Sequence, residues 1–237
     1  MKANATAPPL RAEGLAFGAT RGAVDFTLDR GGMLAVLGDN GSGKSLLLSC
    51  LAGYRWTRGA RVEVHGHNLF DPRERPSAQR LIGAVFQNSG LIRNLSVFEN
   101  VALPFLARSL TLDSELREKV QLRLDLVGCG HLLNRRVTDL SEGDRKCIAL
   151  ARALAGEARV LIADEPFAAL SPKRRALVEE LLVRLTEAGA LSAVVFATQE
   201  LTVANRLATQ FLMMDEPRAV RSLARREKTL LAGAMAE

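Results

Sequence analysis

Residues 33–48, which read MLAVLGDNGSGKSLLL, contain a glycine-rich segment suited to holding phosphate groups. The segment satisfies the pattern G-x-x-x-x-G-K-[ST] with Gly38, Asp39, Asn40, Gly41, Ser42, Gly43, Lys44 and Ser45. Its glycines let backbone N–H groups turn inward around phosphate oxygens. Lys44 supplies a point charge for the terminal phosphates, and the Ser45 hydroxyl can ligate Mg²⁺. The segment therefore predicts a site for a nucleoside triphosphate and Mg²⁺.

Two apolar runs flank this segment and indicate the elements that position it. Residues 33–37 predict a buried strand, and SLLLSCLAG (residues 45–53) predicts an apolar helix that Gly53 closes. A helix that begins near Lys44 directs its positive dipole end at the phosphates. The alternative is a chance match in a tight turn, and the flanking elements argue against it.

A second apolar run ends in two carboxylates. Val160–Ala163 is followed by Asp164 and Glu165. A carboxylate at the carboxyl end of a buried strand lies at the sheet edge where ligands collect, so Asp164 is placed to hold Mg²⁺ directly or through water. Because side chains alternate along a strand, Glu165 is expected to point elsewhere and to polarise an attacking water. The alternative is an ordinary surface pair.

Length and composition predict one globular core and no membrane-spanning segment. The chain has 237 residues, of which 48% are hydrophobic and 24% charged, and a formal charge of +6. No secretory signal or membrane span is recognisable, so a membrane role is expected to come through a partner. The basic clusters SPKRR (171–175) and RSLARREK (221–228) are expected to be solvated.

Cysteine and histidine patterns do not indicate a metal site. Cys50, Cys129 and Cys147 share no metal-type spacing, and their odd number argues against a disulfide framework, so we expect reduced thiols in a cytosolic compartment. The histidines of HGH (65–67) are expected at the surface, at a step from a strand to a turn.

Over residues 10–215, the order of motifs resembles the ATP-binding subunit of an ATP-binding-cassette (ABC) transporter. The motifs after the phosphate loop are AVFQNSG with Gln87, LSEGDRK in the signature position, VLIADEP, AALSP and FATQE. Phe17 occupies the place of the aromatic residue that stacks on adenine. The resemblance implies an α/β P-loop fold, with a RecA-like mixed sheet, an N-terminal antiparallel β region and an inserted helical subdomain. It divides the chain into a nucleotide-binding core (10–87 and 156–215), a helical and signature subdomain (88–155) and a C-terminal tail (216–237).

The resemblance also implies roles for the matched residues. Gln87 would contact Mg²⁺ or the lytic water, and Glu165 would be the base, assisted by Gln199 in the switch segment. Ser141 and Gly143 would face the γ-phosphate of ATP held by a second subunit, so complete sites would form only in a dimer. The implied partners are integral membrane permease subunits and a second copy of the chain or a different ATPase subunit, without nucleic acid. The implied location is peripheral, at the cytoplasmic face of the inner membrane.

Four residues depart from the family pattern. Glu142 stands where glycine is usual, Asp144 where glutamine is common, Gln199 where the family has histidine, and Ser171 where aspartate is usual. A carboxylate ~6 Å from a phosphate charge, at an effective dielectric of ~20, would cost roughly 3 kcal/mol per unit charge. Arg145 and Lys146 could offset that cost, or both acids could simply cap the start of a helix. Glutamine can donate a hydrogen bond but carries no positive charge, which predicts slow hydrolysis.

The middle of the chain is predicted to be helical. LREKVQLRLDLVGC (116–129) places Leu116, Val120, Leu124 and Val127 on one side of a helix. The apolar residues of LIRNLSVFENVALPFLAR (91–108) suit either core packing or a surface groove for a partner's helix. SVFENVALPF is most similar to ATPases of phospholipid-trafficking membrane complexes and of cell division, which suggests lipid transport.

Three functions fit these observations. The first is an ATPase that powers a membrane transporter, and the intact Lys44, Asp164 and Glu165 favour it. The second is a degenerate structural or regulatory subunit that binds ATP with little turnover, which the altered signature and Gln199 favour. The third is a cassette protein that acts on DNA or ribosomes, but the paired cassettes or long coiled-coil insertion usual in such relatives are absent from the sequence.

Overall fold

A computed structural model describes residues 7–16, 23–107, 113–214 and 220–224, the last segment along its backbone only. Phe17 lies outside the described residues. None of the helices in the described ranges has the length and apolar character needed to cross a membrane.

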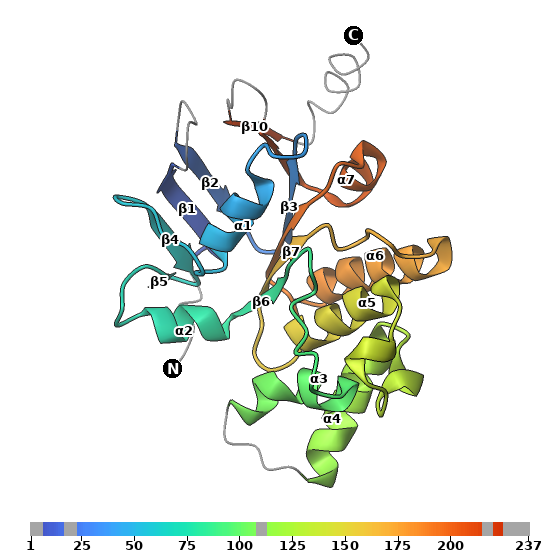
Figure 1. Cartoon of the computed structure of the whole chain (residues 1–237). Helices are drawn as coiled ribbons and strands as arrows, with labels where there is room; N and C mark the ends of the chain where they lie inside the picture. Colours follow the sequence, from blue (N-terminus) through green and yellow to red (C-terminus); the bar gives the residue numbers. More distant parts are fainter. Residues whose placement is uncertain (1–6, 17–22, 108–112, 215–219, 225–237) are drawn as a thin grey trace.

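The larger sheet has six strands in the order β10-β9-β3-β8-β7-β6 (Figure 1). All neighbours are parallel except β9 and β10, which pair antiparallel. The strands are β3 (Gly32–Leu37), β6 (Ile82–Val85), β7 (Val160–Asp164), β8 (Ala193–Ala197), β9 (Gln210–Met214) and β10 (Val220–Ala224).

The smaller sheet has four antiparallel strands in the order β2-β1-β4-β5. They are β1 (Leu10–Leu15), β2 (Val24–Leu28), β4 (Arg61–Val64) and β5 (His67–Asn68). The two sheets confirm the predicted α/β class with a mixed sheet and an N-terminal antiparallel β region.

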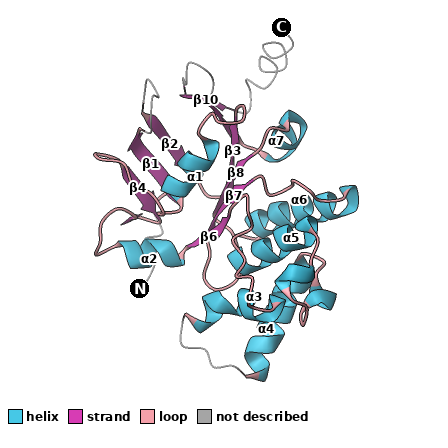
Figure 2. Ribbon diagram, viewed as in Figure 1, coloured by secondary structure: helices cyan, strands magenta, loops and turns pink. Residues whose placement is uncertain are grey.

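Helices cover both faces of the larger sheet, as Figures 1 and 2 show. Helix α1 (Lys44–Leu51) lies between the two sheets, while α5 (Glu142–Ala153), α6 (Pro172–Glu187) and α7 (Leu201–Leu207) lie on the opposite face. The remaining helical segments are α2 (Arg75–Arg80), α3 (Val97–Leu106), α4 (Ser114–Leu126) and the 3₁₀ turns η1 (Gly130–Leu132) and η2 (Val137–Asp139).

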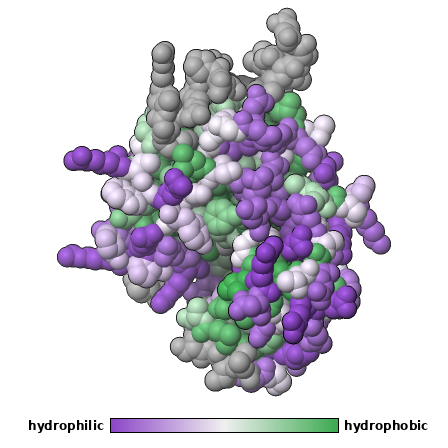
Figure 3. Space-filling view, viewed as in Figure 1, coloured by the Kyte–Doolittle hydropathy of each residue, from purple (hydrophilic) through white to green (hydrophobic). Residues whose placement is uncertain are grey.

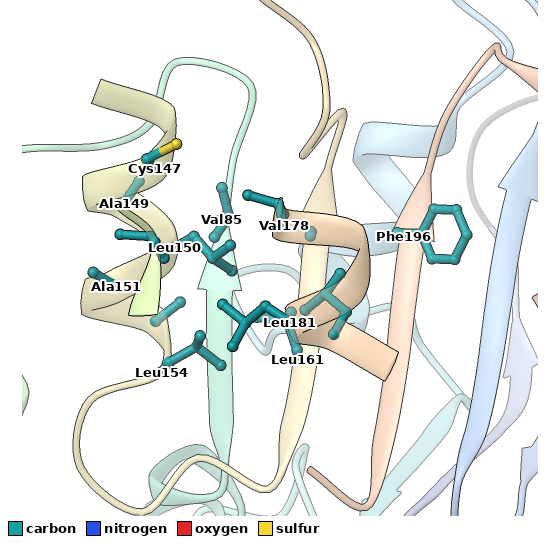
Figure 4. Close-up of a cluster of buried hydrophobic side chains, with 14 of the residues drawn as sticks. Val85, Cys147, Ala149, Leu150, Ala151, Leu154, Leu161, Val178, Leu181 and Phe196 are labelled. Carbon is teal, nitrogen blue, oxygen red and sulfur yellow. The ribbon is translucent and has the colours of Figure 1, made fainter. Parts of the chain in front are cut away.

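Burial on both faces explains why the central strands read as unbroken apolar runs. In β3, Leu34 and Val36 join the core between the sheets, whereas Met33, Ala35 and Leu37 join the core under α5 and α6. A strand with one solvated face would alternate with polar residues instead. Figure 4 shows the second core, where α5 and α6 pack on β6, β7 and β8.

Helices α3, α4 and α5 lie between β6 and β7 in chain order. Ser96 caps α3 in a reciprocal box with Glu99, and Asp113 caps α4 by accepting from Leu116 N. The predicted apolar side of α4 is buried, as are Val97, Val101 and Phe105 of α3. These α3 side chains therefore belong to the core rather than to a groove for a partner. Hydrophobic surface nevertheless gathers over α3 and α4 in the lower part of Figure 3.

His65 corrects the prediction of surface histidines. It is only 4% exposed, and its Nε2 lies 2.8 Å from Ser192 Oγ. Since the Ser192 hydroxyl donates to Arg159 O at 2.9 Å, Nε2 must carry the proton that Ser192 Oγ accepts. The chain turns at His65 with a φ of 49°, which brings the ring inward from the end of β4.

Candidate nucleotide-binding site

Strand register brings three of the predicted segments to one edge of the larger sheet. Ala197 of β8 is opposite Val36 of β3 on one side and Asp164 of β7 on the other. Neighbouring strands lie about 4.8 Å apart, so the carboxyl ends of β3 and β7 are within about 10 Å of each other. The phosphate loop, Gln199 and Glu165 follow these three strands directly.

The phosphate loop has the backbone that its glycines permit. Gly38, Gly41 and Gly43 have φ values of 145°, 82° and 101°. A Cβ atom on Gly38 would lie 2.8 Å from Ser42 Oγ and 2.9 Å from the Met214 carbonyl oxygen. The loop is therefore folded tightly against the end of β9, and only glycine fits at its first position.

The Lys44 side chain folds back onto the phosphate loop. It is 7% exposed, and its ammonium donates to Gly38 O at 2.6 Å and to Asp39 O at 2.8 Å. Ser42 Oγ is buried and has no hydrogen-bond partner among the described residues. Ser45 is exposed in the first turn of α1. An orphan hydroxyl, an ammonium held only by carbonyls and a helix N-terminus fit the phosphates of a nucleotide and Mg²⁺.

Asp164 and Glu165 differ in backbone and surroundings. Asp164 ends β7 and is 3% exposed. Glu165 leaves the strand with a φ of 47° while its N–H donates to Ala197 O at 3.1 Å, so strand alternation does not set its direction. Its Oε1 is buried without a partner in the described chain. Burial raises the pKa of Glu165, and the charge of Lys44 opposes that rise. A carboxyl group with a raised pKa suits a general base.

The switch segment contacts the phosphate loop. Gln199 Nε2 donates to Asn40 Oδ1 at 2.6 Å, and Thr198 N donates to Val36 O at 3.1 Å. The amide of Gln199 thus lies against the loop that would hold the phosphates.

Lys146 connects the glutamine segment to β7, a link that the sequence did not predict. It is buried in α5, and its Nζ donates to Gln87 O at 3.0 Å and to Asp164 O at 3.4 Å. Burial lowers the pKa of Lys146, and the nearby carboxylates of Asp164, Glu142 and Glu165 oppose that shift. Gln87 itself is exposed. No sequence signal distinguished Lys146 from an ordinary solvated lysine.

The signature segment begins α5, with Ser141 as its cap. Ser141 Oγ accepts from Asp144 N at 3.1 Å and donates to Asp144 Oδ2 at 2.6 Å. Asp144 Oδ1 accepts from Arg174 Nη1 of α6 in an ion pair. Burial alone would raise the pKa of Asp144, but hydrogen bonds from Ser141 and Arg174, together with the charge of Arg174, outweigh it and lower the pKa.

The contacts of the basic residues bear on two points about charge. Arg145 and Lys146 are candidates to offset the acids of the signature. Arg145 donates to Leu140 O, and Lys146 donates to Gln87 O and Asp164 O, although the charge of Lys146 also interacts with Glu142. The SPKRR cluster was expected to be solvated, but Arg174 pairs with Asp144 and Arg175 with Glu200. The positive charge that offsets Asp144 comes from Arg174 of α6, because the first turn of α6 lies beside the first turn of α5.

Gly143 is needed where α5 meets the loop after β7. A Cβ atom there would lie 2.7 Å from the Ala169 carbonyl oxygen. Ala169 has a φ of 61°, and Ser171 caps α6 without a side-chain hydrogen bond. The signature helix and the AALSP loop are thus in direct contact.

Two cavities flank the segment around Gln87. One, of about 640 Å³, is lined by Gln87, Arg93, Glu142 and Lys146 among others. The second, of about 700 Å³, lies among α2, β6, α3 and the end of α5, with Tyr54 and Ile92 on its wall. Tyr54 is 68% exposed, although its ring packs edge-on against Phe86 at 5.1 Å.

The described residues contain no group of three or more histidine, cysteine or acidic side chains that would bind a metal unaided. Cys50, Cys129 and Cys147 are free and buried. A Mg²⁺ ion at the sheet edge would therefore need ligands from a nucleotide in addition to Asp164 and Ser45.

Comparison with known proteins gives the family. The family model described as ABC transporter matches residues 22–168. The chain is 37% identical over 198 residues to the sulfate/thiosulfate import ATP-binding protein CysA of Rhodopseudomonas palustris, covering 82% of this chain and 56% of that one. It is 36% identical over 195 residues to the thiamine import ATP-binding protein ThiQ of Jannaschia sp., covering 82% and 83%.

A solved structure agrees with these relatives. The dimeric post-hydrolysis state of the ATP-binding cassette MJ0796, bound to ADP and Pi, superposes with a TM-score of 0.82 at 25% identity. The superposition covers 92% of this chain and 99% of that one. The chain spans about half the length of the CysA relatives that it matches. It belongs to the ABC transporter family, as a nucleotide-binding subunit of the type that carries the ATP-binding cassette.

Proposed function

We propose that the chain binds Mg-ATP and hydrolyses it slowly at the interface of a dimer, and that this cycle drives conformational change in membrane permease subunits. The observation that carries the proposal is the shared sheet edge, where register aligns the Lys44 cradle with Asp164 and with Glu165 just beyond it. Phosphate capture, metal binding and a base are the three components that ATP hydrolysis requires.

Each residue at this edge has a distinct task in the proposed reaction. The Lys44 ammonium exchanges two loop carbonyls for phosphate oxygens, and the loop N–H groups hold the remaining ones. Ser45, Asp164 and Gln87 would hold Mg²⁺, which supplies positive charge against the phosphates. Glu165 accepts a proton from the attacking water. Gln199 donates a hydrogen bond without a charge, which is the reason that we expect slow turnover.

The partners follow from the cassette architecture. Ser141 and Gly143 would face the γ-phosphate held by a second subunit, in a homodimer or in a heterodimer with a related ATPase subunit. Phe17 would stack on adenine. The 700 Å³ cavity, with the exposed Tyr54 on its wall, is a fitting place for a helix from a permease subunit. We place the chain peripherally at the cytoplasmic face of the membrane.

The domain division also remains our proposal. It assigns residues 10–87 and 156–215 to the nucleotide-binding core, 88–155 to the helical subdomain and 216–237 to a tail. The position of α3, α4 and α5 between β6 and β7 supports it.

The cargo class is argued from the relatives. CysA and ThiQ are named for import of sulfate or thiosulfate and of thiamine, which are small solutes. We therefore propose import of a small solute. Lipid transport, which SVFENVALPF suggested, has no support among these relatives.

Calorimetric titration of the chain with Mg-ATP tests the proposal. We expect Lys44→Ala to abolish binding, because the loop loses its only side-chain cation, whereas Lys119→Ala on the exposed surface of α4 should bind as the wild type does. Equal affinity in the Lys44→Ala variant would refute the site.

Turnover separates an ATPase from a degenerate binding subunit, the alternative that the altered signature (Glu142 and Asp144) and Gln199 favour. Glu165→Gln keeps the shape of the side chain and removes the base, so the assembled complex should still bind Mg-ATP but lose most of its turnover, roughly 100-fold or more. Unchanged turnover in this variant would assign hydrolysis to another subunit and favour the structural role.

A further inference from the structure

Asp144 stands in the part of the signature that, in the proposed dimer, faces the triphosphate of the second subunit. Both of its carboxylate oxygens are engaged: Oδ1 accepts from Arg174, and Oδ2 accepts from Ser141 Oγ at 2.6 Å. Its side chain is 18% exposed, so water and salt screen its charge only partly. Asp144 therefore matters more to an approaching phosphate than a freely solvated carboxylate would.

We propose that Arg174 is a positioning residue for the composite ATP site: it neutralises Asp144 so that the start of α5 can approach the γ-phosphate bound to a second subunit. This inference rests on the proposed ATP-bridged dimer and goes beyond it by naming the group that makes the acidic residue at position 144 compatible with ATP.

Electrostatics explains why a partner for Asp144 is necessary. A carboxylate in the first turn of a helix is attracted by the positive end of the helix dipole and so stabilises the helix. The same negative charge reduces the positive potential that would attract a phosphate there. The two cations next in sequence, Arg145 and Lys146, are directed to backbone carbonyls. Arg174 is the cation that reaches the carboxylate, and its planar guanidinium suits a partly buried ion pair.

Arg174 also influences the serine that would touch phosphate. The Ser141 hydroxyl has one proton and donates it to Asp144, so it must turn away from Asp144 to donate to a phosphate. A carboxylate already paired with a guanidinium is a weaker competitor for that proton. Gly143 has no Cβ, so the start of α5 lies close to the Ala169 carbonyl in the loop that leads into α6, and this close approach brings Arg174 within reach of Asp144.

Association measured by sedimentation velocity with Mg-ATP tests the proposal. The experiment uses the Glu165→Gln full-length chain so that ATP persists during the run. In that background, we expect Arg174→Met to weaken ATP-dependent dimerisation about tenfold or more. Arg184→Met is the matched control, since Arg184 lies on the same helix and pairs with Glu180 on an exposed face. It should leave the dimerisation constant unchanged.

Two further measurements separate charge from structure. Asp144→Asn, combined with Arg174→Met, should restore dimerisation to within about threefold of the background, because no unpaired carboxylate remains at position 144. The defect of Arg174→Met alone should shrink as salt rises from 50 to 500 mM, which a simple packing defect would not do. Asp144→Asn by itself keeps an oxygen that can accept from Ser141 Oγ and should dimerise at least as well as the background.

The outcomes distinguish the two levels of inference. Absence of ATP-dependent association in the Glu165→Gln background would overturn the proposed dimer and the role of Arg174 with it. Association that Arg174→Met does not alter would overturn the role of Arg174 alone. Weaker association of Asp144→Asn, or a double variant no better than Arg174→Met, would equally contradict charge neutralisation. The Asp144→Asn result does not depend on how well the Arg174→Met variant folds.

Discussion

The Gln199 side-chain amide donates a hydrogen bond of 2.6 Å to Asn40 Oδ1, which joins the segment after β8 to the phosphate loop. The donor therefore lies against the loop in which we propose that the phosphates bind. A donor held in advance stabilises developing charge without the cost of reorganisation.

We expect Gln199→Ala to lower the ATP turnover of the assembled complex roughly 10- to 100-fold, because this donor is lost. Gln199→His should raise turnover above the wild type, since imidazole can also carry charge and move a proton. Gln210→Ala on β9 is the control and should not alter the rate. Rapid wild-type turnover that Gln199→Ala leaves unchanged would contradict this prediction.

Lys146 should be required for turnover more than for ATP affinity. Its ammonium fixes the carbonyls of Gln87 and Asp164 relative to each other, and small displacements of catalytic groups reduce rates strongly. Lys146→Met should lower kcat about tenfold or more, with the Mg-ATP dissociation constant within about threefold of the wild type. Lys119→Met gives the comparison at a partly exposed lysine that pairs with Glu115 on α4. Equal kcat values for the two variants would show that the bridge is dispensable.

Gly143→Ala should separate the signature helix from the loop after β7. The added methyl group would lie 2.7 Å from the Ala169 carbonyl oxygen, so α5 or the loop must move. We expect a loss of about 1–3 kcal/mol in the free energy of unfolding, together with weaker ATP-dependent dimerisation. Chemical denaturation with urea measures the first effect. A variant as stable as the wild type would mean that the contact is not tight in solution.

His65 should make stability depend on pH below its ordinary pKa of 6.5. Burial, aided by the charges of Arg30 and Arg159, lowers the pKa of His65 in the folded chain, so the unfolded chain binds the proton more readily. The stabilising contribution is full above about pH 6.5 and is lost as pH falls through the folded pKa.

The stability difference between the wild type and His65→Asn should therefore shrink between pH 7.5 and 5. Asparagine tolerates the positive φ at this position, so strain does not confuse the comparison. Thermal unfolding at several pH values provides the measurement, with the exposed His131→Asn as control. A pH-independent difference would indicate that the ring is protonated or solvated in the folded chain.

Short-range patterns were sufficient to predict the phosphate loop, the strand before it, the helix after it and the end of β7 at Asp164. These features depend on residues a few positions apart: glycines that permit positive φ and apolar runs that demand burial. The same patterns predicted the buried side of α4 correctly. They misplaced His65, because a positive φ at a non-glycine residue has no local signature.

Contacts between residues far apart in the sequence could be identified only in the tertiary structure. Arg174 lies 30 residues from Asp144, Gln87 lies 59 residues from Lys146, and Gln199 lies 159 residues from Asn40. In the sequence, Arg174 belonged to an ordinary basic cluster and Asp144 to a signature that repels phosphate. Their charges cancel only because α5 and α6 pack side by side on one face of the sheet, and the packing of helices against strands cannot be read from neighbouring residues.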